Sequence, residues 1–359
     1  MSSIQALPST CKAACVTNAG PDFQVVVEEV QVPLPAEGEV LVRLSVTGLC
    51  FSDIHYMLEV IIRPKMTEFG IRSPGHEGVG TVVAKGSGVS TLSIGDRVGI
   101  KPIWSTCSVC RLCCDNREMY CSDALQTGIH KPGTYQQYIL SSASHTIKIP
   151  TSLEDWAAAP LLCSGTTIYR GLSESGVSAG QWIVISGAGG GVGHLGIQYA
   201  RAMGLSVIAI DGGEAKRDLC MKLGANDYVD FTKNNDIIAE VLRITEGAGA
   251  QAVFVTASNA AAYRDLPGML RIGGVVMCIG IPPPGTADAG GDPLVLIGKN
   301  LKLTGVLVGT RNDVVDALNV AKQANIRPIV EHFRLSDIGT AVAKLRNGNV
   351  NGRCVVKFD

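Results

Sequence analysis

Four cysteines fall within one short stretch of the chain, with the spacing Cys107-x2-Cys110-x2-Cys113-x7-Cys121. Four thiolates this close would repel one another without a cation, and tetrahedral Zn²⁺ takes four cysteines in a closed structural site. An iron–sulfur cluster is the alternative, because the first spacings match ferredoxin-like runs, although the last spacing differs and no proline follows Cys121. We therefore expect a structural zinc that stabilises this lobe, and we expect the adjacent Cys114 to be a bystander.

A glycine-rich segment, Gly187–Gly193, follows the apolar run Gln181–Ser186 directly and precedes a helical pattern that stops at Gly204. Glycines between a strand and a helix let the backbone approach a pyrophosphate, which the amides at the helix N-terminus can bind. Ala188 stands where the usual motif has its first glycine, so a turn without a ligand is the alternative. The expected cofactor contacts in this segment are Gly187, Gly190, Gly191, Val192 and Gly193.

Asp211 ends the next apolar run, Ser206–Ile210. A carboxylate at this place accepts hydrogen bonds from the ribose hydroxyls of a dinucleotide and repels a 2′-phosphate. The sequence therefore favours NAD(H) over NADP(H). Lys216 follows closely and could also reach the ribose, although a solvated helix lysine is an equally good interpretation.

Three further segments carry metal-binding or proton-transferring side chains, namely Cys50–His55, Gly75–Gly80 and Leu162–Ser164. With the cysteine lobe, the Asp-Gly-Gly-Glu run at residue 211 and Gly352-Arg353, they resemble the zinc-dependent alcohol dehydrogenases of the medium-chain family, in particular the yeast and fungal members. The resemblance covers nearly the whole chain, and its motifs follow the order of the family.

The resemblance implies that Cys50, His76 and Cys163 bind a catalytic zinc and leave a fourth position open for water or substrate. A zinc ion there lowers the pKa of an alcohol, and hydride then passes to the nicotinamide. Buried core cysteines are the alternative for Cys50 and Cys163 taken alone. Glu77 adjoins the metal and either tunes it or binds it transiently.

The resemblance also implies a proton relay. Ser52 would receive the alcohol proton and pass it through the cofactor ribose to His55, for which a packing or surface role is the alternative. Asp53 would orient His76 through the free ring N–H. Arg353 would bind the cofactor pyrophosphate, with a plain surface arginine as the alternative.

The chain departs from this family at two places. Phe51 replaces a cationic or polar residue that contacts the pyrophosphate, so we expect weaker cofactor binding. The segment Met57–Ser73 is longer than in the yeast type, and Pro102 matches a pocket tryptophan of relatives. We expect a wider apolar pocket and a substrate bulkier than ethanol, unless Trp104 and the long segment refill the space.

Two scaffolds must position these residues. Short strands at Val40–Val46, Gly78–Lys85 and Arg97–Ile100 indicate a β-rich first part. After Gly180, strands and helices alternate, with one helix expected over Ala260–Leu270, which is typical of a parallel, doubly wound sheet. The predicted fold is α/β, with a β-rich, GroES-like catalytic domain (1–164 and 309–359) around a Rossmann domain (165–308).

The totals exclude several classes of protein. A net charge of −1 gives no basic surface for nucleic acid, no apolar stretch is long enough for a bilayer, and the N-terminus has no signal-peptide pattern. We expect a cytoplasmic homo-oligomer, a tetramer or else a dimer, that acts on a small alcohol or aldehyde with two zinc ions per subunit.

Three other functions remain as alternatives. One is a dedicated biosynthetic oxidoreductase for a specialised metabolite, which only kinetics on substrates of graded size can separate from a general enzyme. The second is a non-catalytic binding protein on the same fold. The third is a zinc-free quinone or enoyl reductase of the same superfamily, against which both cysteine patterns argue.

Overall fold

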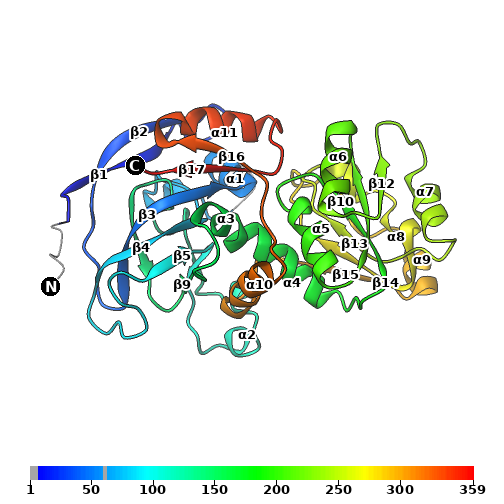
Figure 1. The fold of residues 1–359 in the computed structure, drawn as a ribbon, viewed down its shortest axis with the longest axis horizontal. Helices are drawn as coiled ribbons and strands as arrows, with labels where there is room; N and C mark the ends of the chain where they lie inside the picture. Colours follow the sequence, from blue (N-terminus) through cyan, green and yellow to red (C-terminus); the bar gives the residue numbers. More distant parts are fainter. Residues whose placement is uncertain (1–6, 60–62) are drawn as a thin grey trace. The chain divides into compact units, whose positions relative to one another are not determined.

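The structure is a computed structural model that describes residues 7–59 and 63–359 (Figure 1). The chain folds into two compact units. The first contains the residues up to Cys163 together with Val330–Asp359, and the second contains Ser164–Ile329. Among the described residues, no helix is long and apolar enough to cross a membrane.

The first unit is built on a mostly antiparallel sheet whose strands come from both ends of the chain. Its order is β16-β17-β3-β4-β5-β9, and β8 also pairs with β3. The last strand, β17 (Arg353–Lys357), pairs with β3 (Glu39–Leu49), so the C-terminus returns to the N-terminal half (Figure 1). The other strands of this sheet are β4 (Gly78–Lys85), β5 (Arg97–Ile100), β8 (Tyr138–Ser142), β9 (Ile147–Lys148) and β16 (Val330–Arg334).

Alternation along β3 builds one of the cores of this unit. Val40, Val42 and Leu44 project to the same side and pack with Val82 and Val98 of the neighbouring strands. A second core lies under the hairpin of β1 (Thr10–Thr17) and β2 (Gln24–Gln31), where α1 and α11 pack. The remaining elements of this unit are α1 (Phe51–Leu58), β6 (Ile103–Ser105), α2 (Arg111–Cys114), β7 (Leu125–Gln126), α3 (Asp155–Pro160) and α11 (Ile338–Arg346).

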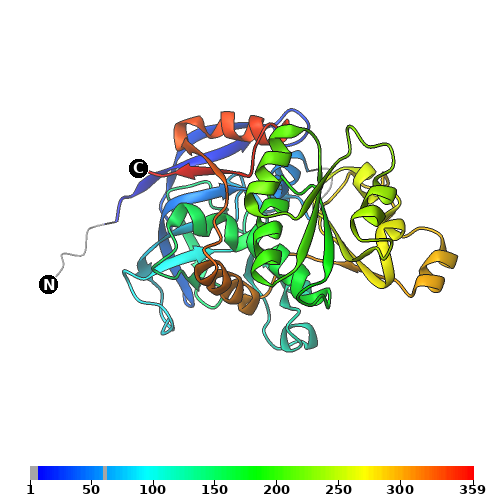
Figure 2. The same cartoon turned by 45° about the vertical axis from the view of Figure 1, so that its right-hand side comes forward.

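The second unit is a parallel six-stranded sheet in the order β12-β11-β10-β13-β14-β15. Its central strand β10 (Trp182–Ser186) is apolar without alternation because helices cover both faces of the sheet (Figure 2). The strand order reverses between β10 and β13, and ligands of such sheets bind beyond the carboxyl ends at this point. The other strands are β11 (Ser206–Asp211), β12 (Asp227–Asp230), β13 (Ala250–Val255), β14 (Leu270–Cys278) and β15 (Lys302–Gly305).

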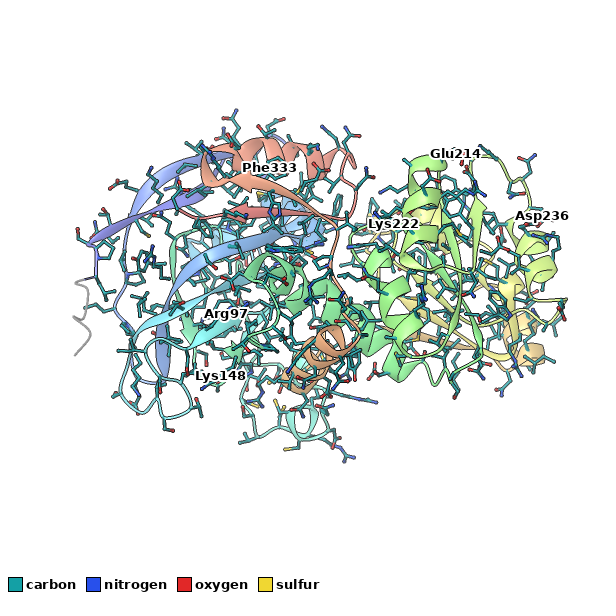
Figure 3. The ribbon with its side chains drawn as sticks, viewed as in Figure 1. Arg97, Lys148, Glu214, Lys222, Asp236 and Phe333 are labelled. Carbon is teal, nitrogen blue, oxygen red and sulfur yellow. The ribbon has the colours of Figure 1, made fainter. Side chains whose placement is uncertain are left out.

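Helix ends in the second unit follow local chemistry. Glu214 and Lys222 lie at the N- and C-terminal ends of α6, where each charge complements the helix dipole (Figure 3). Asp236 caps α7 by accepting a hydrogen bond from the N–H of Ala239 (2.9 Å). The helices are α4 (Thr166–Glu174), α5 (Gly193–Ala202), α6 (Glu214–Leu223), α7 (Ile237–Ile244), α8 (Leu266–Met269), α9 (Pro293–Lys299) and α10 (Arg311–Gln323).

The sequence placed one helix at Ala260–Leu270, and that prediction is wrong. The segment forms a 3₁₀ turn, Ala260–Tyr263, and then the separate short helix α8. Asp265 between them is left-handed, with φ of 56°, and Pro267 cannot donate to the preceding turn.

The second unit also extends to Ile329 instead of ending at 308. The reason is the packing of α10, whose start is held by Asp313 against Arg170 of α4 (2.5 Å). Tyr199 of α5 also donates a hydrogen bond to the carbonyl oxygen of Ala317 (2.9 Å). Residues 309–329 therefore belong with the parallel sheet, and only the last 30 or so residues, from Val330, belong to the first unit.

Candidate functional site

Cys50, His76, Glu77 and Cys163 come together in the first unit, with one ligand atom of each lying within 4.8 Å of the others. Three local features place them. Cys50 caps the N-terminus of α1, His76 and Glu77 directly precede β4, and Cys163 lies in the π-helical turn Leu161–Gly165. All four residues are buried.

The carboxylate of Asp53 organises this cluster. Its Oδ1 lies 2.8 Å from Nδ1 of His76. Its Oδ2 accepts hydrogen bonds from the N–H of Cys50 (2.9 Å) and from the hydroxyl of Tyr135 (2.9 Å). With Nδ1 facing the carboxylate, Nε2 of His76 is the nitrogen left for a metal, which is the arrangement of oriented zinc-binding histidines.

The two thiols interact directly. A hydrogen bond from Cys163 lowers the pKa of Cys50 well below its ordinary value and raises the pKa of Cys163. One thiolate therefore forms readily inside a buried site. Two sulfurs and an imidazole nitrogen are soft donors that suit Zn²⁺ and not the oxygen-seeking Mg²⁺ or Ca²⁺.

Behind these ligands, Glu77 forms a buried ion pair with Arg353, the first residue of β17. Burial raises the pKa of Glu77 to about 7. Oε2 of Glu77 is buried and finds no hydrogen-bond partner among the described residues. A carboxylate oxygen of Glu77 lies within 4.8 Å of the two sulfurs and the imidazole nitrogen, which fits a site that receives a cation.

Arg353 was expected at the cofactor pyrophosphate. In the structure its guanidinium group is buried against Glu77, so the alternative interpretation of Arg353 as a plain surface arginine is wrong. Its Nε has no partner within the described part of the chain. The pyrophosphate role stays a prediction.

The four-cysteine lobe is assembled as its spacing predicts. Sulfur–sulfur distances are 3.5 Å for Cys110–Cys113, 3.5 Å for Cys107–Cys121 and 3.9 Å for Cys107–Cys113. A tetrahedron with Zn–S bonds of about 2.3 Å has edges of about 3.8 Å, so these distances fit a zinc ion. The N–H groups of residues 109 and 110 lower the pKa of Cys107 to about 7.

Cys114 is exposed and lies outside this group, with its sulfur 3.7 Å from the carbonyl oxygen of Val109. The bystander role is therefore consistent with its position. All twelve cysteines are free thiols, so no disulfide competes with metal binding.

Ser52 and His55 lie on α1, one turn apart. Ser52 is half-buried, and His55 is buried with its ring edge-on to Phe51 at 5.1 Å between centroids. Burial lowers the pKa of His55, and no described residue bonds its Nδ1. His55 therefore has a packing role, and its role in the proton relay stays a prediction.

The glycine segment of the second unit forms the turn between β10 and α5. Gly187 has φ of 79°, a conformation that costs other residues energy. A Cβ on Gly193 would collide with the backbone of Gly187 and Ala188, so glycine is required there for close packing. The N–H of Gly190 donates to the carbonyl of Gly187 (3.0 Å), which closes the turn.

Asp211 lies at the end of β11 beside this turn and accepts a hydrogen bond from the N–H of Gly189 (2.7 Å). Lys216 of α6 donates to the carbonyl of Gly189 (2.9 Å), so it is not a purely solvated lysine. A cavity of about 460 Å³ lies at this edge of the sheet, lined by residues that include Gly187, Asp211 and Phe231. Its position is the ligand site expected of a doubly wound sheet.

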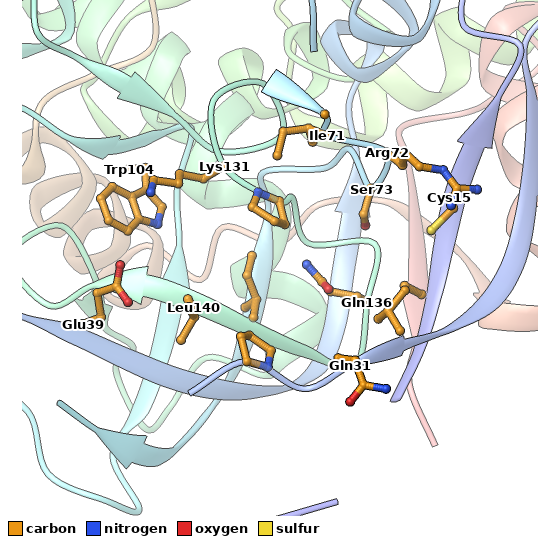
Figure 4. Close-up of a pocket in the computed structure, with 16 residues that line it drawn as sticks. Cys15, Gln31, Glu39, Ile71, Arg72, Ser73, Trp104, Lys131, Gln136 and Leu140 are labelled. Atoms are coloured by element: carbon orange, nitrogen blue, oxygen red, sulfur yellow. The ribbon is translucent and has the colours of Figure 1, made fainter. Parts of the chain in front are cut away.

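The residues expected to set the width of the substrate pocket belong to the first unit. Met57 and Met66 are fully buried in the core under the β1–β2 hairpin, and residues 60–62 lie outside the described part of the chain. Trp104 lines a cavity of about 380 Å³ with Ser73 and Gln136 (Figure 4). Lys131 places its ammonium group 4.8 Å from the centroid of the indole ring.

Sequence reasoning missed two residues at these sites. Tyr135 donates to Asp53, and His194 contacts the glycine turn. Tyr135 is 82 positions from Asp53 and belongs to no motif, so only the fold brings the pair together. For His194, the available signal was its place directly after the last glycine of the turn.

Two family models match the chain. The alcohol dehydrogenase GroES-like domain covers residues 36–151, and the zinc-binding dehydrogenase domain covers residues 191–323. These matches confirm the predicted fold class, a GroES-like domain with a parallel-sheet Rossmann domain.

Similar proteins extend over almost the whole chain. Alcohol dehydrogenase 1 of Emericella nidulans is 38% identical over 337 residues, 93% of this chain and 94% of the relative. An alcohol dehydrogenase of Schizosaccharomyces pombe is 38% identical over 341 residues, 95% of each chain. An alcohol dehydrogenase of Geobacillus stearothermophilus is 37% identical over 349 residues, 97% of this chain and all of the relative.

Solved structures agree with the sequence relatives. The alcohol dehydrogenase of Aeropyrum pernix superposes with a TM-score of 0.85 and 26% identity, over 96% of this chain and 99% of the other. Acetophenone reductase of Geotrichum candidum, solved in complex with NAD, gives 0.83 and 25% identity over 98% of each chain.

These matches, with two assembled cysteine-containing clusters, argue against a non-catalytic binding protein and against a zinc-free reductase. The predicted enzyme class is confirmed, since the relatives are named alcohol dehydrogenases and the matching domain is that of a zinc-binding dehydrogenase. The protein is an oxidoreductase that uses zinc and a pyridine nucleotide on small alcohols or aldehydes, and it belongs to the zinc-dependent alcohol dehydrogenases of the medium-chain dehydrogenase/reductase family.

Proposed function

We propose that this enzyme is NAD(H)-linked, holds one catalytic and one structural zinc per subunit, and acts reversibly on primary or secondary alcohols bulkier than ethanol. The observation that carries the cofactor proposal is the carboxylate of Asp211 at the cavity beside the glycine turn. A negative charge there favours ribose hydroxyls over a 2′-phosphate. The NAD bound to the Geotrichum reductase supports the same preference.

Two donor sets support two zinc ions. The four sulfurs of the lobe leave no position open, as a structural ion requires. Cys50, His76 and Cys163 form the second set, with Glu77 as a nearby carboxylate that could bind transiently.

A zinc ion held by Cys50, His76 and Cys163 would supply Lewis-acid chemistry, which lowers the pKa of an alcohol and polarises a carbonyl. The chain's own residues do the rest. Asp53 holds the ring of His76, and Ser52 receives the alcohol proton. His55, with its pKa lowered by burial, is neutral near pH 7 and accepts the proton at the outer end of the relay.

The substrate proposal rests on the departures from the yeast type at Met57–Ser73 and Pro102, and on the positions of nearby large side chains. Met57 and Met66 pack in the core, and Trp104 lines the separate cavity of Figure 4. The Geotrichum relative is named for a bulky aromatic ketone, which is consistent with a large pocket in this family.

We further propose that the protein is a homo-oligomer. β15 is an edge strand of the parallel sheet, and apolar side chains are exposed around it. Ile272, Leu294 and Ile297 expose 72%, 73% and 77% of their surface. An apolar surface beside the edge strand of a sheet is where a second copy of the chain would bind. A tetramer and a cytoplasmic location stay predictions.

The test is a set of initial rates for the zinc-replete protein with NAD or NADP and alcohols graded from ethanol to aromatic and allylic ones. We expect kcat/KM to be higher with NAD and to peak at large alcohols. A peak at ethanol would refute the wide pocket, and a preference for NADP would refute the role of Asp211. Activity confined to one large alcohol would favour a dedicated biosynthetic oxidoreductase.

A further inference from the structure

The helix after the glycine turn carries a buried histidine that none of these roles uses. His194 is the second residue of α5 and is fully buried. Its Nδ1 lies 2.8 Å from the carbonyl oxygen of Gly190, and its Nε2 lies 3.1 Å from the backbone nitrogen of Ile329. Because the N–H of Ile329 can only donate, Nε2 accepts, and Nδ1 of the neutral ring carries the proton that Gly190 receives.

One turn further along α5, Gln198 holds the same backbone segment. Its amide nitrogen donates to the carbonyl of Arg327 (2.9 Å), and its amide oxygen accepts from the N–H of Arg327 (3.1 Å). Residues four apart share a helix face, so His194 and Gln198 bind residues 327–329 as a neighbouring strand would. On its far side, the ring of His194 therefore bonds to a segment that α5 also holds through Gln198.

The carbonyl oxygen of Gly190 accepts two hydrogen bonds from His194, one from Nδ1 (2.8 Å) and one from the backbone N–H (3.1 Å), and together they set the direction of the next amide. In a trans peptide, the carbonyl of Gly190 and the N–H of Gly191 point in opposite directions. With the carbonyl held by His194, the N–H of Gly191 points away from the histidine. Among the described residues, no backbone acceptor takes the N–H of Gly191 or of Val192. Free amides at the start of a helix are donors for a phosphate.

We propose that His194 is a positioning residue for cofactor binding, which holds the amides of Gly191 and Val192 ready for the pyrophosphate through its bond to Gly190. The proposal rests on the cofactor site proposed above. It differs from a purely structural role in what it predicts. Removing the bond to Gly190 should lower nucleotide affinity, whereas removing the bond to Ile329 should not.

Two variants separate the bonds. H194Q places an amide where Nε2 was, so it keeps an acceptor for Ile329 and loses the donor to Gly190. H194N keeps a donor near the position of Nδ1 and loses the acceptor for Ile329. The control is Y199F, which removes the buried hydrogen bond from Tyr199 to Ala317 on the same helix and leaves the turn intact.

The experiment is a fluorescence titration of each zinc-loaded protein with NADH, followed by steady-state kinetics. Losing a hydrogen bond that aligns a phosphate-binding turn should raise the Kd of H194Q about tenfold. H194N and Y199F should stay within about twofold of the wild type in Kd, although their melting temperatures fall. The KM for the nucleotide should rise in H194Q, while kcat at saturating nucleotide stays unchanged.

Wild-type affinity in H194Q would overturn the proposal, and so would an equal loss of affinity in Y199F. A wild-type protein that binds NADPH and not NADH would instead refute the NAD preference. The variants would then be compared with NADPH, because both nucleotides contain the same pyrophosphate.

Discussion

At the residue scale, the carboxylate of Asp53 has three partners. It lies against the imidazole of His76, and it accepts hydrogen bonds from the hydroxyl of Tyr135 and the N–H of Cys50. The role of Asp53 towards His76 followed from the family resemblance, in which Asp53 lies three residues after the zinc ligand Cys50. The third partner, Tyr135, is fully buried and lies far along the chain. The hydroxyl of Tyr135 holds the carboxylate of Asp53 in place, and this carboxylate in turn orients the imidazole of His76.

Removing this hydroxyl should weaken the catalytic metal site selectively. In Y135F we expect the affinity for the zinc at Cys50, His76 and Cys163 to fall about tenfold, since outer partners of zinc ligands contribute this much. The measurement is zinc release to a chromophoric chelator, in which two phases should separate the two ions. Y138F is the control, and equal release from Y135F and Y138F would contradict the role.

Phe51 gives a second prediction at this scale. Its ring packs on His55 and against the core under the β1–β2 hairpin, and it cannot donate a hydrogen bond. In F51R, a guanidinium group at the start of α1 should lower the Kd for NADH about tenfold, as a charge-assisted hydrogen bond to a phosphate would. Stopped-flow release of NADH measures the same change as a slower dissociation. An unchanged Kd would show that position 51 does not contact the cofactor.

At the scale of the elements, the cysteine lobe has little regular structure to hold it. Its helix α2 spans only Arg111–Cys114, and none of its residues is buried. A segment without its own hydrophobic core needs cross-links to stay folded. In the cysteine lobe, four sulfurs bound to one metal ion would form such a cross-link. The sequence predicted this element from spacing alone because the ligands are close in the chain.

Cys110 and Cys114 provide a matched pair to test this. C110S should lose one zinc per subunit by elemental analysis and lower the melting temperature by several degrees, because a structural metal contributes folding energy. C114S should keep both ions and its melting temperature, since Cys114 lies outside the cluster. A loss of zinc in C114S would make Cys114 a ligand after all.

At the scale of the whole molecule, the exposed apolar surface near β15 is the feature that a single chain leaves unexplained. I297E places a charge in the middle of α9, where Ile297 is 77% exposed. If copies of the chain meet there, burying this charge is costly and the native mass should fall in light scattering. I94E, at a 58% exposed isoleucine of the first unit, is the control. An unchanged mass in I297E would place the subunit contact elsewhere.

The sequence by itself determined the motifs whose members are close along the chain. The cysteine lobe, the glycine turn with Asp211 and the βα alternation are local, because spacing and periodicity encode them directly. The strands β4 and β5 even begin and end where their composition placed them. The ligand set Cys50, His76 and Cys163 came from resemblance, and its assembly in the structure depends on three distant segments.

Only the tertiary structure decided the rest. The pairing of Glu77 with Arg353, the support of Asp53 by Tyr135 and the bond between His194 and Ile329 join residues far apart in the chain. No local pattern marks such contacts, because they follow from how strands and helices pack. The same reason moved the end of the second unit from 308 to Ile329, since the packing of α10 on α4 and α5 outweighs the change of pattern in the sequence.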